Sequence, residues 1–373
     1  MKNYKLLTPG PLTTTDSVKR EMLFDHCTWD DDYKCITQKI RNQILDLAHA
    51  SKEKYTTVLM QGSGTFGVES VISSVIGKED KCLFIANGAY GERMVSIAEY
   101  HNINTIVIEQ EYNLLPSLEL IEETLKSNNE ITHVMMVHCE TTTGILNDIK
   151  SVGQLAKKHS KVFMVDAMSS FGGIDIDVNE CEIDFLISSS NKCIQGVPGF
   201  SFIIANKELL IASKGKARSL SLDLYDQWMG MDKDGKWRFT SPTHVVLAFS
   251  KALDELEKEG GVSARYNRYS NNNKLLRKRM AKIGINSYLE DEIQSPIITT
   301  FVYDNRKFTF REMYDYIKER GFAIYPGKLT KVETFRLGNI GEIYEEDINN
   351  LCDIFETFFN EMIACKEIAC NIR

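Results

Sequence analysis

The chain has 373 residues, of which 43% are hydrophobic and 26% charged, and this is the composition of an ordinary globular protein with a sizeable core. Its formal net charge of −8 gives no general basic field, which argues against nucleic acid as a partner. Nine scattered cysteines without a C-x-x-C pair, and no apolar run long enough for a signal peptide or a membrane span, predict a cytoplasmic protein with reduced thiols, no metal site and no membrane contact.

Short apolar runs alternate with helix-like segments through the first two thirds of the chain. Strands are predicted at 55–60, 81–87, 105–110, 132–140, 161–167 and 184–190, with helices at 65–77, 90–101, 117–127 and 149–159. The runs are near-continuous in Val, Ile, Met and Phe, which is typical of strands buried on both faces. The alternation therefore predicts an α/β fold with a mixed, mostly parallel sheet flanked by helices.

The pattern changes after a long helix predicted at 240–261, which ends in Gly-Gly. A charged helix at 262–284 follows it, and then strands at 295–303, 322–327 and 334–341 lie beside helices at 309–320 and 344–363. We therefore predict an N-terminal arm (1–15), a large α/β domain (16–259) and a smaller C-terminal α+β domain (260–373).

The segment "QGSGTFGVES" reads Gly-x-Gly-x-x-Gly through Gly62, Gly64 and Gly67, the pattern of a dinucleotide-binding turn. A turn of that kind also needs an acidic residue at the end of the next strand, but the next strand here ends in Asn87. Backbone N–H groups at a helix start bind any phosphate, and the Ser and Thr between the glycines add hydroxyl donors. We therefore interpret the segment as a phosphate turn, with an NAD dehydrogenase and a plain tight turn as alternatives.

Two later strands end in residues that suggest a specific cofactor. Asp166 closes the apolar run "KVFMVDA", and Lys192 follows "FLISSS", so both are expected at the carboxyl edge of the sheet where ligands bind. Pyridoxal phosphate needs a lysine for its aldehyde, a carboxylate for its ring nitrogen and a cradle for its phosphate. Each element alone is usually structural, but the three together predict a pyridoxal phosphate enzyme.

The chain resembles the class V aminotransferase family, which has the fold of type I pyridoxal phosphate enzymes. The resemblance runs from "LLTPGPLTT" to "FRLGNIGE" and is most specific in "CTWDDDY", "NGAYGERM", "HCETTTGILN", "VDAMSSFGG", "SSSNKCIQGVPGF" and "YPGK". Within the family it is similar to the branch that acts on 2-aminoethylphosphonate and pyruvate. The resemblance thus implies transamination of these two substrates to phosphonoacetaldehyde and L-alanine.

The resemblance also implies a role for individual residues. Lys192 matches the lysine that forms the Schiff base with the cofactor, and Asp166 matches the partner of its ring nitrogen. The phosphate turn corresponds to Ser63, Gly64 and Thr65.

The remaining matches concern the ring, the phosphate, the substrate and a second subunit. Tyr90 matches the aromatic residue that stacks on the pyridine ring, where relatives often have Trp, and Thr141 matches a hydroxyl near the cofactor's phenolic oxygen. Asn191 sits where relatives place a polar group that reaches the phosphate, and Arg336 matches the arginine that binds the substrate's anionic group. Finally, Trp237 and Thr240 match positions that reach the phosphate in the neighbouring subunit, which implies a homodimer.

Several of these residues have simpler interpretations. Tyr90 and Trp237 could be packing residues, and Glu140 could only hold backbone groups. The acidic run "WDDDY" (29–33) is expected as a solvated loop, with a role in the substrate pocket or a dimer as the alternative. Arg93, Arg218 and Arg238 are candidates for selecting phosphonate over carboxylate.

Among functions, the nearest alternative is an alanine or serine–glyoxylate aminotransferase, which would share every cofactor residue. A cysteine desulfurase would need a reactive cysteine over the site, and Cys352, Cys365 and Cys370 lie in or after the last predicted helix. If the chain were a non-catalytic binding module, the presence of Asp166 and Lys192 at the ends of two apolar strands would be a coincidence.

Overall fold

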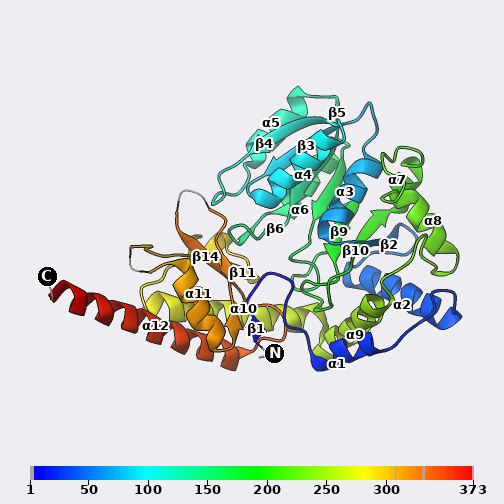
Figure 1. Cartoon of the computed structure of the whole chain (residues 1–373). Coiled ribbons are helices and arrows are strands. Elements are labelled where there is room, and N and C mark those ends of the chain that lie inside the picture. The colour runs from blue at the N-terminus through cyan, green and yellow to red at the C-terminus, as the bar shows by residue number, and fades with distance from the viewer. Residues whose placement is uncertain (1–3, 307, 330–331, 372–373) are drawn as a thin grey trace.

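A sheet of seven strands lies at the centre of the computed structural model, which describes residues 4–306, 308–329 and 332–371 (Figure 1). Across the sheet the strand order is β2, β10, β9, β8, β5, β3, β4. Their bounds are β2 Tyr55–Gln61, β3 Lys81–Ala86, β4 Asn104–Glu109, β5 Ile131–Val137, β8 Val162–Asp166, β9 Phe185–Ser189 and β10 Phe200–Asn206. Only β10 runs antiparallel to its neighbours. The predicted mixed, mostly parallel sheet is confirmed, and its six parallel strands end at one edge.

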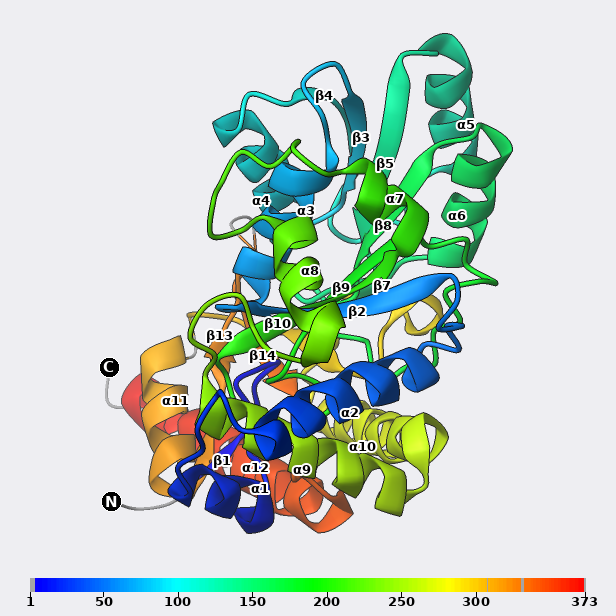
Figure 2. The same ribbon diagram turned by 90° about the vertical axis from the view of Figure 1, so that its right-hand side faces the viewer.

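Helices cover both faces of this sheet because its strands are apolar on both sides. Along β2, Val58 and Met60 pack into one apolar cluster, while Leu59 points into the other. The first face carries α3 Gly64–Val75, α4 Ala89–Tyr100, α7 Lys207–Ala212 and α8 Leu224–Asp234. The second carries α2 Asp31–Leu47, α5 Leu118–Ser127, α6 Ile149–Lys158 and α9 Thr243–Glu259, with α2 and α9 side by side in Figure 2.

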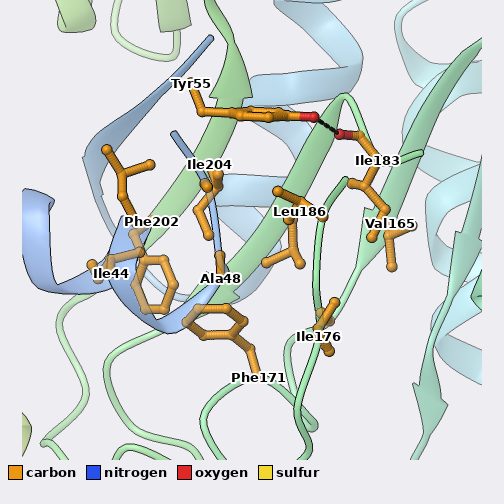
Figure 3. Close-up of a cluster of buried hydrophobic side chains, with 14 of the residues drawn as sticks. Ile44, Ala48, Tyr55, Val165, Phe171, Ile176, Ile183, Leu186, Phe202 and Ile204 are labelled. Atoms are coloured by element: carbon orange, nitrogen blue, oxygen red, sulfur yellow. Dashed lines mark hydrogen bonds between the residues drawn. The ribbon is translucent and has the colours of Figure 1, made fainter. Parts of the chain in front are cut away.

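Aromatic rings fill the core on the second face (Figure 3). The rings of Phe171 and Phe202 meet edge to face with their centroids 5.6 Å apart, and each buried ring of this size contributes about 1.5–3 kcal/mol. Tyr55 donates its hydroxyl to the carbonyl of Ile183 at 3.0 Å, so its one polar atom is not left unpaired by burial. This packing holds the ends of the strands, and with them the residues that follow, in fixed positions.

The C-terminal part has a core of its own around a three-stranded antiparallel sheet. Its strands are β11 Ile298–Val302, β13 Tyr325–Pro326 and β14 Thr334–Gly338, and its helices are α10 Gly261–Lys282, α11 Phe310–Glu319 and α12 Glu345–Asn371. Gly260, which has positive φ, ends α9 and precedes α10, whose first residue, Gly261, also has positive φ, as the predicted Gly-Gly stop requires. The α+β character is as predicted, whereas the residue boundaries of the domains stay predictions.

The N-terminal segment lies against this C-terminal part, as Figure 1 shows. Strand β1 (Lys5–Leu6) pairs in parallel with β12 (Phe322–Ala323). The N–H of Leu7 donates to the carbonyl of Ala323 at 2.8 Å, and the N–H of Gly338 donates to the carbonyl of Leu7 at 3.0 Å. The chain then passes through α1 (Asp16–Arg20) and a short 3-10 turn (Glu21–Leu23) to reach α2. A small hairpin of β6 (Cys139–Glu140) and β7 (Ile145–Leu146) completes the fold.

The prediction of a solvated loop at 29–33 was wrong. Asp31 begins helix α2, whose first turn carries the acidic side chains Asp31 and Asp32, where they interact favourably with the helix dipole. Tyr33 is buried and its hydroxyl lies 2.6 Å from the Ser241 hydroxyl. The acidic run masked a helical pattern of buried residues that starts at Tyr33.

Among the described helices, none is both long enough and apolar enough to cross a membrane.

Candidate active site

A cavity of about 160 Å³ lies at the carboxyl edge of the sheet, beside the first turns of α3 and α4. It is lined by predicted cofactor residues from four separate segments, namely Ser63, Gly64, Thr65, Tyr90, Asp166, Asn191 and Lys192. Parallel strands bring these segments together because their carboxyl ends share an edge. The cavity also has apolar walls, from residues such as Met94 and Met168.

Asp166 is a buried carboxylate at the end of β8. One of its oxygens accepts the N–H of Met168 at 2.8 Å. Burial raises the pKa of this carboxyl to about 6, against the opposing effects of that hydrogen bond and of Lys192. A cation at the cavity would favour the ionised form, so the position suits a positively charged ring nitrogen.

Lys192 reaches the cavity from the loop after β9 and contacts the N-terminal arm. Its ammonium donates to the carbonyl of Pro9 at 2.9 Å, and burial lowers its pKa. Gly10 packs on the same side chain, since a Cβ there would lie 2.7 Å from Lys192 Cδ. Gly10 also has a φ of +123°, which L side chains rarely adopt. A glycine is therefore required where the arm crosses this lysine.

The glycine-rich segment turns directly from β2 into α3. Ser63 is the N-cap residue, and its side chain makes no capping hydrogen bond, so its hydroxyl is available to a ligand. The N–H groups of the first helical turn also point out of the helix start, which favours an anion there. Arg93 adds a positive charge, with its guanidinium 3.5 Å from the hydroxyl of Thr65.

Tyr90 joins the cavity to the predicted substrate arginine. Its ring lines the cavity, and Thr141 and Arg336 are among the groups that act on the pKa of its phenol or are acted on by it. Burial raises the pKa of this phenol, but Lys192 and Lys328 outweigh that effect and the net pKa is lowered. Arg336 is buried on β14 and donates from Nη1 to the Thr141 carbonyl at 3.0 Å. Thus Thr141 and Arg336 lie one layer behind the cavity wall.

Glu140 holds the start of α4 from outside the helix. Its buried carboxylate accepts the N–H groups of Tyr90 at 3.1 Å and Gly91 at 3.2 Å, and the Thr142 hydroxyl at 2.6 Å. Gly88, the N-cap residue, has no side chain to do this. A Cβ on Gly88 would lie 2.2 Å from Glu140 Cγ. The predicted alternative, that Glu140 holds backbone groups, describes these contacts, and the backbone it holds belongs to Tyr90.

Two predicted residues lie away from the cavity. Trp237 is buried in this chain's own core, where it packs edge to face on Phe200 and donates Nε1 to the Thr37 hydroxyl at 3.3 Å. These contacts agree with the packing interpretation of Trp237, and its role at the phosphate of a neighbouring subunit stays a prediction. Thr240 is exposed, and its carbonyl accepts the side-chain amide of Gln61 at 2.9 Å.

The three arginines considered for phosphonate selection differ in position. Arg93 lines the cavity. Arg218 donates to the carbonyls of Ile76 and Gly77 beyond α3, and Arg238 pairs with Asp226 at 3.1 Å. Both of these interactions are structural, so only Arg93 remains a candidate.

The model of the family described as "Aminotransferase class-V" matches residues 27–337 of the chain. The chain belongs to the class V aminotransferase family. Proteins named 2-aminoethylphosphonate–pyruvate transaminase are similar to this aminotransferase along almost its whole length. The one from Lysinibacillus sphaericus (strain C3-41) is 58% identical over 96% of this chain and 98% of its own, and the one from Bacillus thuringiensis (strain Al Hakam) is 59% identical over 94% and 96%.

Solved structures of other aminotransferases share the fold of this chain. Pyridoxamine–pyruvate aminotransferase from Mesorhizobium loti has a TM-score of 0.89 at 22% identity, covering 97% of this chain and 93% of that one. Alanine–glyoxylate aminotransferase from Nostoc sp. has a TM-score of 0.88 at 22% identity, covering 96% and 95%. The predicted fold of type I pyridoxal phosphate enzymes is confirmed.

Pyridoxal phosphate is the cofactor of this class V aminotransferase, and the cavity fits it. Three groups match the three parts of the cofactor. The buried carboxylate of Asp166 matches a cationic ring nitrogen, the Ser63 hydroxyl, which makes no capping hydrogen bond, matches a phosphate, and the amine of Lys192 matches an aldehyde.

Family membership also rules out the NAD dehydrogenase. Asn87, which follows β3 where a dinucleotide site needs an acidic residue, bonds to Asn147 at 2.8 Å. Cys352 is buried in α12, and the side chains of Cys365 and Cys370 lie outside the described residues.

Three further residues contribute to this site without having been predicted from their local sequence. Lys328 lies with its ammonium 4.3 Å from the centre of the Tyr90 ring, Ser189 lines the cavity, and Pro9 binds Lys192. The segments "YPGK" and "LLTPGP" were part of the resemblance, but nothing in their local pattern indicated which residue would face the site.

Proposed function

We propose that this aminotransferase transfers the amino group of 2-aminoethylphosphonate to pyruvate and releases phosphonoacetaldehyde and L-alanine. The observation that carries the proposal is the 58–59% identity to transaminases of that name along at least 94% of the chain. The site agrees with it, because a cationic group, Arg336, lies behind Tyr90 at the cavity. An arginine fork can bind a phosphonate in one half-reaction and a carboxylate in the other.

Residues of the cavity divide into those that hold the cofactor and those that act on the substrate. Ser63, Gly64, Thr65 and Asn191 would hold the phosphate, with Arg93 adding its charge. Tyr90 would stack on the ring and Thr141 would lie near its phenolic oxygen, while Asp166 would pair with the ring nitrogen. Arg336 would bind the anionic end of the substrate.

The chemistry needs one base that can lose and regain a proton inside a closed site. Pyridoxal phosphate, when bound, supplies an electron-withdrawing ring that accepts the electron pair of the substrate's C–H bond. Lys192 can take the proton from the amine-bearing carbon, because burial lowers its pKa and makes the neutral amine accessible. Asp166 would keep the ring nitrogen protonated, and the Lys192 ammonium donates to the Pro9 carbonyl of the arm.

A two-substrate assay tests this function. Purified holoenzyme with 2-aminoethylphosphonate and pyruvate should form L-alanine and phosphonoacetaldehyde in equal amounts, and omission of either substrate should stop both. Lys192→Ala should lose at least about 10³-fold in rate, since it removes the proton-transfer group and the attachment point together. A Lys192→Ala variant that still formed alanine at the wild-type rate would contradict the proposed mechanism.

The alternative of an alanine or serine–glyoxylate aminotransferase is separated by the same assay. Serine or alanine with glyoxylate should give a kcat/KM at least about tenfold below that of the phosphonate pair. The solved alanine–glyoxylate relative shares only 22% of the sequence, which supports the fold and not the substrate.

We also propose a cytoplasmic homodimer. Large apolar side chains are exposed on the surface, with Phe66 at 50% exposure on α3, Phe239 at 43% beside Thr240, and Trp29 at 69%, and such side chains suit contact with a protein partner. A second copy would bring Thr240 toward the neighbouring phosphate turn. Light scattering should give about twice the chain mass, whereas a monomeric mass would contradict the proposal.

The described cysteines are all free thiols, which suits a reducing compartment.

A further inference from the structure

The loop after β13 is held against the site by backbone contacts. Arg336 donates from Nε to the carbonyl of Pro326 at 3.0 Å, and the N–H of Gly327 donates to the carbonyl of Thr334 at 2.8 Å. Gly327 leaves no room for a side chain, because a Cβ there would lie 1.9 Å from the Thr334 hydroxyl. The position of the next residue, Lys328, is therefore tied to the position of Arg336.

Lys328 adds to the positive charges of Lys192, Arg93 and Arg336 around Tyr90. Its ammonium lies 4.3 Å from the centre of the Tyr90 ring. Within the described part of the chain, no carboxylate lies within 4.0 Å of this ammonium. Its hydrogen-bonding capacity is thus not taken up by an ion pair.

Arg336 uses part of its donor set within the protein. Nε and one N–H of Nη1 donate to the carbonyls of Pro326 and Thr141. The second N–H of Nη1 and the two of Nη2 remain for an incoming anion. They can bind either acid, but the guanidinium balances one negative charge, whereas a phosphonate has three oxygens and up to two negative charges.

Acidic side chains lie on the far side of Lys328. A second cavity, of about 470 Å³, is lined by Lys328 together with Glu92, Glu109 and Glu111. These carboxylates would repel a doubly charged anion more strongly than a singly charged one. Lys328 is the cation between this wall and Tyr90.

From this arrangement we infer that Lys328 is a specificity-determining residue that binds the phosphonate of 2-aminoethylphosphonate together with Arg336. The inference rests on the proposed function. By this inference Lys328 determines the preference for phosphonate, because a carboxylate substrate needs its charge less. Removal of the Lys328 charge should therefore affect the half-reaction with 2-aminoethylphosphonate more than the half-reaction with the carboxylate substrate.

Lys328→Met tests the inference, because it keeps the length of the side chain and removes the charge. The KM for 2-aminoethylphosphonate should rise about tenfold to hundredfold, the usual worth of a hydrogen bond to a charged group. The KM for L-alanine in the reverse direction should rise less than about threefold, and Lys328→Arg should restore most of the loss. Equal changes for both substrates, or none, would overturn the inference.

Lys54→Met is a matched control, since that ammonium lies 5.0 Å from the ring of Tyr55, far from the cavity; it should leave both KM values unchanged. Calorimetric titration of holoenzyme with methylphosphonate and acetate gives a readout without turnover. Lys328→Met should weaken methylphosphonate binding at least about tenfold more than acetate binding, and equal weakening would contradict the inference. If wild-type enzyme failed to use 2-aminoethylphosphonate, the proposed function would fail, while this titration would still decide the role of Lys328.

Discussion

The sequence predicted the positions of several single residues at this site, but it did not predict their pKa values. Asp166 and Lys192 could be identified because each follows an apolar strand. Their shifted pKa values depend on desolvation at the cavity and on neighbours distant in sequence, which no local pattern encodes. Trp237 also lies in a motif that matched the family, but its indole packs against Phe200 in the core of its own chain. An aromatic residue in such a motif can therefore be a core residue.

The raised pKa of Asp166 predicts an effect on stability without cofactor. The native chain holds this proton up to about pH 6, whereas an unfolded chain releases it near pH 4. Stability therefore falls as pH rises through this window and stays reduced above it, by up to ~3 kcal/mol. Asp166→Asn should abolish this loss, because the amide oxygen can still accept the Met168 N–H.

Urea unfolding of the cofactor-free proteins between pH 4 and pH 8 would measure this. The variant should gain stability relative to wild type as pH rises, although it should be nearly inactive once cofactor is added. A difference that shrank with rising pH would show that burial does not control this carboxyl.

Among elements, α4 depends most clearly on a contact from outside itself. A helix whose N-cap is Gly88 has no side-chain cap of its own, and the Glu140 carboxylate takes that place. The sequence predicted both the helix and the strand that precedes Glu140. It could not predict their junction, because the two segments are 50 residues apart and their contact depends on the order of β3 and β5 in the sheet.

Gly88→Ala should disrupt this junction, since the new methyl group would overlap Glu140. The backbone at Gly88 is extended, so the effect is steric and not conformational. We expect a loss of about 1–3 kcal/mol in the free energy of unfolding and weaker binding of pyridoxal phosphate, because Tyr90 moves with the helix start.

Gly230→Ala in α8 serves as the control, because the nearest atom to a Cβ there is 3.5 Å away; it should be neutral or slightly stabilising. The double variant Gly88→Ala, Glu140→Ala should bind cofactor no worse than Glu140→Ala alone. Additive losses would show that the methyl group and the carboxylate act independently.

At the scale of the whole molecule, the active site is closed by segments from both ends of the chain. The arm pairs with β12, crosses Gly338 of β14, and places the Pro9 carbonyl on Lys192. The sequence predicted an arm and a C-terminal α+β part, but not that one holds the other. Strands of two residues, such as β1 and β12, are too short to show a periodic pattern.

Gly338→Ala should act on Lys192 through the arm. A Cβ at Gly338 would lie 2.5 Å from the backbone of Thr8, and the arm would have to move. Since Gly338 itself does not line the cavity, a loss of kcat of about tenfold or more would show that the position of the arm controls the lysine. Unchanged kcat with Gly338→Ala, at an unfolding midpoint close to that of wild type, would show that it does not.

The pairing of Lys5 with Phe322 also sets an order of events during synthesis. The arm leaves the ribosome before its partner strand, which is made more than 300 residues later, and closing so long a loop is slow. The large sheet can form while the arm is still unattached, with Lys192 open to solvent. We expect the nascent chain to become competent for catalysis only when its final fifth has emerged, so that its earliest residues are among the last to reach their native place.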